Sequence, residues 1–253
     1  MPNVYKSVPA IQKCFAIMDL MSKTEKPLGI SEISSRLKLN KSTVFNIVHT
    51  LVELRVLDDL SDFKFEFGPR LYILGNASGK RSELIRIVHP HLKRINMETR
   101  LSVFLGIRSG LTSVLIDKVD STYVIKISSE IGMQMPDLGG VGIKAMLSLL
   151  SREDVENLIG KTVLKSYTPN SITDKEAYLK EIEKIRRERI AYDREEYIEG
   201  ITAVGVPVTH HNREVQAAIW VVGLKRQLQS KTLVNVKTLL KNTAMEINQR
   251  LGR

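Results

Sequence analysis

The sequence predicts an α+β protein with an N-terminal winged helix-turn-helix, a linker helix, and a C-terminal antiparallel sheet with flanking helices. Three observations support this fold class. The chain has 253 residues, more than a single hydrophobic core comfortably holds. Apolar residues recur at helical spacing in the first third, whereas alternating and β-branched runs dominate the rest. We therefore expect a first domain at 1–75, a linker helix at 76–98 and a second domain at 99–253.

The composition favours a globular protein with a polyanionic partner. The formal net charge is +10, and cations that replace phosphate counterions gain affinity for nucleic acid. Because these cations are spread along the chain, a DNA partner must be argued from local arrangement. No apolar run approaches the roughly eighteen residues of a membrane span, so we expect no membrane partner and a cytoplasmic location. Cys14 is the only cysteine, which excludes an internal disulfide and a thiolate metal cluster.

Three helices are predicted in the first domain. The first is indicated by apolar residues three and four apart, which are Val8, Ile11, Phe15 and Met18. Ser31 is the expected N-cap of a short second helix that buries Ile33 and Leu37. A three-residue turn at 39–41 leads into a third helix from about 42 to 54. Two short helices joined by so tight a turn are typical of a helix-turn-helix.

The outward face of the third helix carries hydroxyls, an amide and cations. An Asn side chain can pair with adenine through two hydrogen bonds, hydroxyls can reach base edges or phosphates, and Lys anchors the backbone. The alternative is a solvated helix face without a partner. With the preceding turn and helix we favour DNA, and the candidate contacts are Ser31, Arg36, Lys41, Ser42, Thr43, Asn46, His49 and Lys64.

A wing is predicted after the third helix. Residues 58–62 resemble a turn, and 63–67 alternate as a hairpin strand does. Lys64 can touch a phosphate, but an acidic tip formed by Asp58, Asp59 and Asp62 repels one. We therefore expect only a minor role for the wing in binding DNA.

The second domain is predicted to hold an antiparallel sheet. An amphipathic helix at 81–98, interrupted near Pro90, precedes it and can pair with its counterpart in a second subunit. Strands are expected at 101–107, 113–119, 123–127, 203–209 and 215–222. A capping-box sequence at 173–176 opens a helix that runs to about 189, and a last helix spans about 231–251.

Several segments, taken in order, form a specific pattern. They are Lys41-Ser42-Thr43-Val44, Leu51-Val52-Glu53-Leu54, the segment 68–75, Pro136 with Lys144-Ala145, and Glu196 with Gly200-Ile201 and Val206-Pro207-Val208. In order and spacing they resemble the isocitrate lyase regulator (IclR) family over essentially the whole chain. The resemblance implies a transcription regulator that binds operator sites in double-stranded DNA. It further implies a GAF-like C-terminal domain that senses a small-molecule effector, and assembly as a dimer or a pair of dimers.

Three positions depart from the family pattern. Asn46 stands where Arg is common, which we expect to alter the operator that is read. Arg55 stands where Gly commonly turns the chain into the wing, so strain is expected if this turn needs a positive φ. Ile143 stands where Gly usually precedes the lysine, so the backbone path there can differ.

The glycine-rich segment 136–145 is the most informative part of the second domain. Glycines before an apolar helix let backbone N–H groups approach a ligand, and a helix N-terminus favours an anion. The alternative is a tight turn without a ligand, and the residues alone leave both open. By the family resemblance, this loop and two strands surround an effector pocket whose candidate residues are Leu138, Gly139, Gly140, Val141, Asp193, Ala203, Trp220 and Val222.

The expected effector is a hydrophobic or aromatic acid. In relatives that bind small hydroxy or keto acids, Cys or Ser often occupies the positions held here by Ala203, Trp220 and Val222. Losing those hydroxyls removes donors for a compact polar acid, and the Trp ring adds an aromatic wall. The alternative is that Trp220 only fills the core.

Two other functional classes are alternatives to a regulator. A metabolite-processing enzyme built on the C-terminal domain is the second hypothesis, but no nucleotide-binding, hydrolase or metalloprotease motif occurs. We therefore expect no catalytic residue, no metal and no cofactor. A sequence-independent architectural DNA protein is the third hypothesis, and it predicts binding without an effector pocket.

Overall fold

The computed structural model describes residues 6–80, 82–160, 162–209 and 216–252. The chain divides into two compact units, Met1–Arg81 and Ser82–Arg253, and each is described by itself. The segment expected as one linker helix falls into both units: α4 (Pro69–Lys80) belongs to the first and α5 (Glu83–Thr99) to the second. In the described part of the chain, no helix combines the length and apolarity that crossing a bilayer requires.

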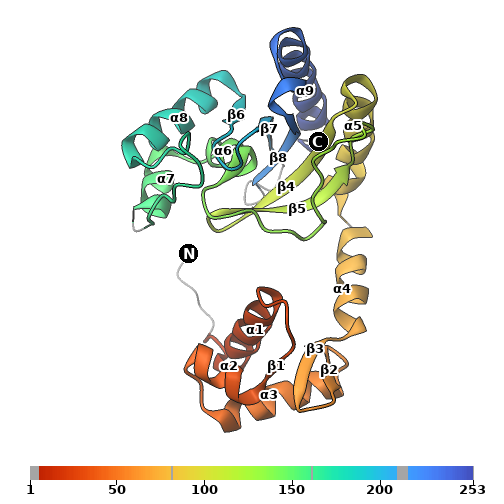
Figure 1. Cartoon of the computed structure of the whole chain (residues 1–253), viewed down its shortest axis with the longest axis vertical. Coiled ribbons are helices and arrows are strands. Elements are labelled where there is room, and N and C mark those ends of the chain that lie inside the picture. Colours follow the sequence, from red (N-terminus) through yellow and green to blue (C-terminus); the bar gives the residue numbers. More distant parts are fainter. Residues whose placement is uncertain (1–5, 81, 161, 210–215, 253) are drawn as a thin grey trace. The chain divides into compact units, whose positions relative to one another are not determined.

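The first unit is the predicted winged helix-turn-helix (Figure 1). Its elements are α1 (Pro9–Ser22), β1 (Leu28–Gly29), α2 (Ile30–Leu37), α3 (Lys41–Glu53), β2 (Leu57–Leu60), β3 (Lys64–Phe67) and α4. The three strands form an antiparallel sheet in the order β1-β3-β2. The apolar stripes of the helices meet this sheet in one core, where Ile17, Val48 and Phe65 are buried.

Two local predictions in this unit were wrong. Ser31 does not cap α2, because Gly29 of β1 is the N-cap and its N–H donates to Glu32 Oε2 at 2.9 Å. The helix therefore begins directly where the strand ends. Asp58 and Asp59 do not lie in the wing turn, because they pair with β3 as part of β2. The tip consists of residues 61–63 only.

The second unit holds the predicted antiparallel sheet between helices (Figure 1). Its strands run in the order β5-β4-β8-β7-β6, and are β4 (Ser102–Ser109), β5 (Thr112–Val119), β6 (Ala191–Arg194), β7 (Ile201–Thr209) and β8 (Gln216–Leu224). Helices α5 and α9 (Ser230–Leu251) pack on one face. The other face packs against α6 (Gly140–Leu147), α7 (Arg152–Ile159) and α8 (Lys175–Glu188). A short 3-10 helix, η1 (Lys225–Gln227), connects β8 to α9.

Strand alternation decides which residues face each helical layer. Along β8, Ile219 and Val221 enter the core beneath α5 and α9, whereas Trp220 and Val222 enter the core beneath α6. Ala203 of β7 faces the α6 side as well. Because side chains alternate between the two faces of a strand, Ala203, Trp220 and Val222, which were predicted to line the pocket, lie on the same face of the sheet.

Three predictions in this unit were wrong. Pro90 does not interrupt α5. Because it is exposed, the backbone hydrogen bond that its missing N–H leaves out lies on the solvent side, while Val88 and Leu92 stay buried. Residues 123–127 form no strand, and the chain instead runs beside β5 later, where Leu115 N donates to Met133 O at 3.0 Å. Strand β6 was missed because it has four residues without a β-branched side chain.

Candidate nucleic-acid interface and ligand pocket

The outer face of α3 presents the predicted polar residues to solvent. Lys41, Ser42 and Asn46 are exposed, and Thr43 is half-buried. No side-chain hydrogen bond caps the helix at Asn40. The first turn and a half of α3 therefore offers an ammonium, hydroxyls and an amide on one accessible edge.

His49 occupies a different environment from the other α3 candidates. Its ring is half-buried between Phe45, at 4.2 Å between centroids, and Phe65, at 5.8 Å in an edge-on contact. His49 therefore joins α3 to the wing strand. Phe45 itself is half-exposed on the outer face of α3 and was missed, although an apolar residue outside the buried stripe was visible in the sequence.

The remaining DNA candidates lie on α2 and the wing. Ser31, Arg36 and Lys64 are all exposed. Glu32 lies among them, and the hydrogen bond from Gly29 N lowers its pKa, helped by the positive charges of Lys64 and Arg36. The carboxylate of Glu32 therefore offsets part of the positive charge between α2 and the wing.

A cavity of about 210 Å³ opens between the first turn of α6 and the sheet. Six of the predicted effector residues line it, namely Gly140, Val141, Asp193, Ala203, Trp220 and Val222. Leu138 and Gly139 line a neighbouring hollow of only about 20 Å³ instead. There Leu138 adopts a φ of 57° and its carbonyl accepts a 3.1 Å hydrogen bond from the Tyr178 hydroxyl, so the loop turns away from the larger cavity.

Much of the cavity wall was not foreseen. The additional lining residues are Phe104, Ile127, Ser128, Ser129, Met133, Met135, Tyr197, Ile198 and Ile201. Most of them come from irregular segments, which carry no periodic signal that would place them beside α6. Their side chains make the wall largely apolar and aromatic.

Trp220 both lines the cavity and fills the core. It is only 5% exposed and its ring meets Phe104 edge-on at 5.9 Å. Two glycines make room for its six-membered ring: a Cβ at Gly106 would lie 2.6 Å from Cη2, and a Cβ at Gly142 would lie 3.1 Å from Cζ3. The two roles considered for this residue therefore do not exclude each other.

Asp193 supplies the only carboxyl group among the lining residues of this cavity. It is 8% exposed, and its Oδ1 accepts a 2.7 Å hydrogen bond from Glu196 N. Burial raises the pKa of Asp193, although that hydrogen bond opposes the shift. Helix α6, whose N-cap is Gly139, has no side-chain cap, and N–H groups in the first turn of an uncapped helix favour an anion.

A buried lysine ties the cavity wall to the sheet edge. Lys144 is 1% exposed, and its Nζ donates to Tyr192 O at 2.5 Å and to Glu196 Oε2 at 2.6 Å. Since Tyr192 belongs to β6, the last strand of the sheet, this ammonium binds the backbone of the edge strand. Lys144 thereby joins α6 to β6, which includes Asp193, and to Glu196 in the segment that follows β6.

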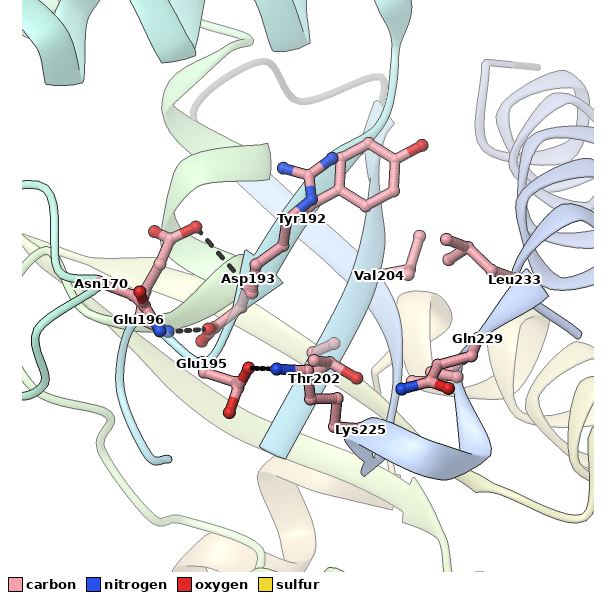
Figure 2. Close-up of a pocket in the computed structure, with 13 residues that line it drawn as sticks. Asn170, Tyr192, Asp193, Glu195, Glu196, Thr202, Val204, Lys225, Gln229 and Leu233 are labelled. Atoms are coloured by element: carbon pink, nitrogen blue, oxygen red, sulfur yellow. Dashed lines mark hydrogen bonds and ion pairs between the residues drawn. The ribbon is translucent and has the colours of Figure 1, made fainter. Parts of the chain in front are cut away.

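A second, larger hollow of about 570 Å³ lies at the same sheet edge and is drawn in Figure 2. Figure 2 shows Asp193 bonded to Glu196 at the end of β6, and the ion pair of Glu195 with Lys225 beside it. The larger hollow includes only Asp193 and Ala203 of the predicted effector residues. Over the described ranges, no group of three His, Cys, Asp or Glu side chains is arranged to hold a metal ion.

Comparison with family models decides the identity. The model of the IclR helix-turn-helix domain matches residues 10–59, and the model named bacterial transcriptional regulator IclR C-terminal matches residues 77–249. The chain belongs to the IclR family. It is therefore a transcription regulator with a DNA-binding helix-turn-helix and the family's C-terminal domain, as the motifs indicated. Both matches favour this function over the enzyme hypothesis.

Individual relatives agree with this assignment. The HTH-type transcriptional repressor AllR of Escherichia coli strain K12 is 26% identical over 253 residues, which cover 99% of this chain and 93% of AllR. The crystal structure of the Thermotoga maritima IclR protein superposes with a TM-score of 0.69 at 29% identity, covering 97% of this chain and 99% of that one. An IclR homologue from Microbacterium hydrocarbonoxydans, solved with 4-hydroxybenzoate, shares the fold with a TM-score of 0.75 at 20% identity, covering 96% and 98%.

Proposed function

We propose that this IclR-family regulator reads operator DNA in the cytoplasm with the outer face of α3 and that an aromatic acid in the 210 Å³ cavity changes this binding. The observation that carries the proposal is the pairing of two features. One is an accessible polar edge on α3, with Lys41, Ser42 and Asn46 exposed. The other is a largely apolar cavity that Asp193 and the first turn of α6 also line.

Specific DNA binding is assigned to Asn46 and its neighbours on α3. An exposed amide one turn after Lys41 and Ser42 can reach a base edge while they contact phosphates. We would enrich duplexes from a random 30-base-pair library and measure affinity by fluorescence anisotropy. Asn46→Ala should weaken the enriched duplex roughly 5- to 100-fold, the range of one bidentate contact, and leave scrambled DNA unaffected. Asn242→Ala, an exposed amide of the second unit, is the matched control.

The effector is assigned from the chemistry of the cavity walls. The uncapped N-terminus of α6 suits a carboxylate, and the rings of Phe104 and Trp220 suit an aromatic body. Asp193 suits a hydroxyl donor. A relative solved with 4-hydroxybenzoate supports this class by analogy. Because Trp220 is the only tryptophan, its fluorescence reports the titration. A response to a small hydroxy acid and to none of the hydroxylated benzoates would contradict the assignment.

A dimer or a pair of dimers is proposed from the first unit. Apolar side chains are exposed on α1 and α4, at Val8, Ile11, Phe15, Tyr72 and Ile73. A second copy covering these surfaces would bury them and pair two recognition helices, whose spacing must match about one DNA turn or a multiple. Phe15→Glu should shift sedimentation toward the monomer, whereas Val163→Glu, an 81% exposed apolar position in the second unit, should not.

The effector is proposed to act through Lys144. A ligand against Gly140 and Val141 moves the first turn of α6, and Lys144, one turn later, carries that movement to the end of β6. Glu195 follows β6 and pairs with Lys225 of η1, which leads into α9. Helix α9 is bound to α5 through Arg94 and Glu246 at 2.8 Å. Because α5 directly follows the first unit in the chain, its displacement changes the recognition-helix spacing. Unchanged operator affinity at saturating effector would exclude this coupling.

A further inference from the structure

The tip of the wing combines backbone strain with an exposed aromatic ring. Phe63 has a φ of 55° and is 84% exposed, and Asp62 before it has a φ of 74°. The left-handed region is unfavourable for a bulky L residue, and an exposed ring gains nothing from burial. Glycine would fit this turn better on both counts. Such an uncompensated cost points to a function for the ring outside the free protein.

The surrounding structure holds this ring outward. Strand β3 pairs with β1 on one side and with β2 on the other, and Phe65 anchors it in the core at 1% exposure. On the neighbouring strand β1, a Cβ at Gly29 would lie 3.3 Å from Phe63 O, so the backbone of the turn packs closely against β1. The contact of Phe65 with His49 places the wing beside α3.

We propose that Phe63 is an apolar wedge that enters the minor groove next to the major-groove site of α3 and unstacks a base step. The inference rests on the proposed DNA binding. Phe is among the side chains that proteins insert between base steps, which kinks the duplex and favours deformable sequences. The wedge therefore gives the protein a preference for a flexible step that α3 does not contact.

Charge at the wing favours an apolar contact over an ionic one. The hairpin carries the single cation Lys64 against the four carboxylates of Asp58, Asp59, Asp62 and Glu66. Lys64 also acts on the carboxylate of Glu32. Phosphate attraction is thus too weak to seat this wing, and contact between the ring and a base step remains as the attractive interaction.

The test compares Phe63→Gly with Phe63→Leu. Binding is measured by anisotropy on the duplex enriched by the wild-type full-length protein, and 2-aminopurine at successive positions reports unstacking. Phe67→Ala removes a partly exposed ring from the far end of the same strand and is the matched control. Thermal melting of each variant measures folding, and sedimentation measures its association state.

We expect Phe63→Gly to bind roughly tenfold more weakly, the order of one base–aromatic stacking contact, and to lose the 2-aminopurine signal. Its thermal stability should be equal or higher, because the strain is relieved. Phe63→Leu should keep most of the signal, since Leu also wedges. Equal binding by Phe63→Gly and wild type overturns the inference, as does a change only in association state. If the wild type enriches no duplex, the proposed DNA binding itself fails.

Discussion

The seating of Trp220 against Gly106 can be tested by a double-mutant cycle. In Gly106→Ala the new methyl carbon would lie 2.6 Å from Trp220 Cη2 and 3.1 Å from Val114 O. The ring must retreat toward the cavity, and such overpacking costs about 1–3 kcal/mol of unfolding free energy. Phe lacks the outer ring atoms, so in a Trp220→Phe background the same methyl fills vacated space. We expect a coupling free energy of about 1–2 kcal/mol between the two substitutions.

Urea unfolding followed by far-UV circular dichroism measures all four proteins, since Trp fluorescence is lost in half of them. Gly79→Ala on α4 is the control, because a Cβ there meets nothing within 4 Å, and it should cost no stability. The Gly106→Ala protein should also bind its ligand more weakly, because the displaced ring occupies the cavity. If Gly106→Ala lowers the unfolding free energy equally in both backgrounds, the ring does not press on this position and the reasoning is refuted.

Three further predictions each concern the effect of one side chain on stability. Arg55 has a φ of 57° and is exposed, so Arg55→Gly should raise the unfolding free energy by about 0.5–1 kcal/mol. Arg55→Ala keeps the Cβ and should give no such gain. Equal melting curves for the two variants would argue against backbone strain at this position. Lys144→Met leaves Glu196 without its ammonium and should cost about 3–5 kcal/mol in urea unfolding, part of which Glu196→Gln in the same protein restores. The raised pKa of Asp193 means that its neutral form stabilises the fold at low pH and that this contribution is lost as pH rises through the folded pKa. Asp193→Asn should therefore raise the unfolding free energy at pH 7. Below about pH 4, the ordinary pKa of Asp, it should have no such effect. An equal gain at both pH values would contradict this explanation.

The periodic part of the molecule could be predicted from its sequence. Spacing of three and four located α1 and α3, and α3 buries the predicted stripe. In α1 the stripe was misassigned, because Ile11 and Phe15 are exposed and the helix buries Ile17 and Met21 instead. Alternation along β7 and β8 brought Ala203, Trp220 and Val222 to one face, since successive strand residues point to opposite sides. The glycines before α6 left a ligand site and a tight turn without a ligand both open, and in the structure Gly140 and Val141 line a cavity.

The parts without a period could not be predicted. Met133 and Met135 reach the cavity on an irregular segment that hydrogen-bonds along β5, and nothing in their spacing specifies that path. Lysine is almost never fully buried unless paired, so the position of Lys144 depends on Glu196, a partner 52 residues away, and on an edge carbonyl. Contacts of this kind can be predicted only once the order of the strands in the sheet is known.

Three positions break local rules, and their placement carries information that propensity alone does not. Arg55 and Phe63 adopt left-handed backbone at the two ends of the wing, and Lys144 buries a charge beside the ligand cavity. A sequence selected for stability alone would place glycine at the first two positions. It would replace Lys144 together with its partner Glu196 by apolar residues of similar volume, since replacing one partner alone leaves a buried charge. The costs fall on the element that flanks the recognition helix and on the wall that a ligand would touch, whereas the cores beneath α5 and α9 are built from apolar side chains. Lys38, Arg100 and Arg189 also adopt left-handed backbone, but each ends a helix as its C-cap, where that conformation is common. Phe63 and Lys144 have no such local role, and residues of this kind are expected where recognition, rather than folding, fixes them.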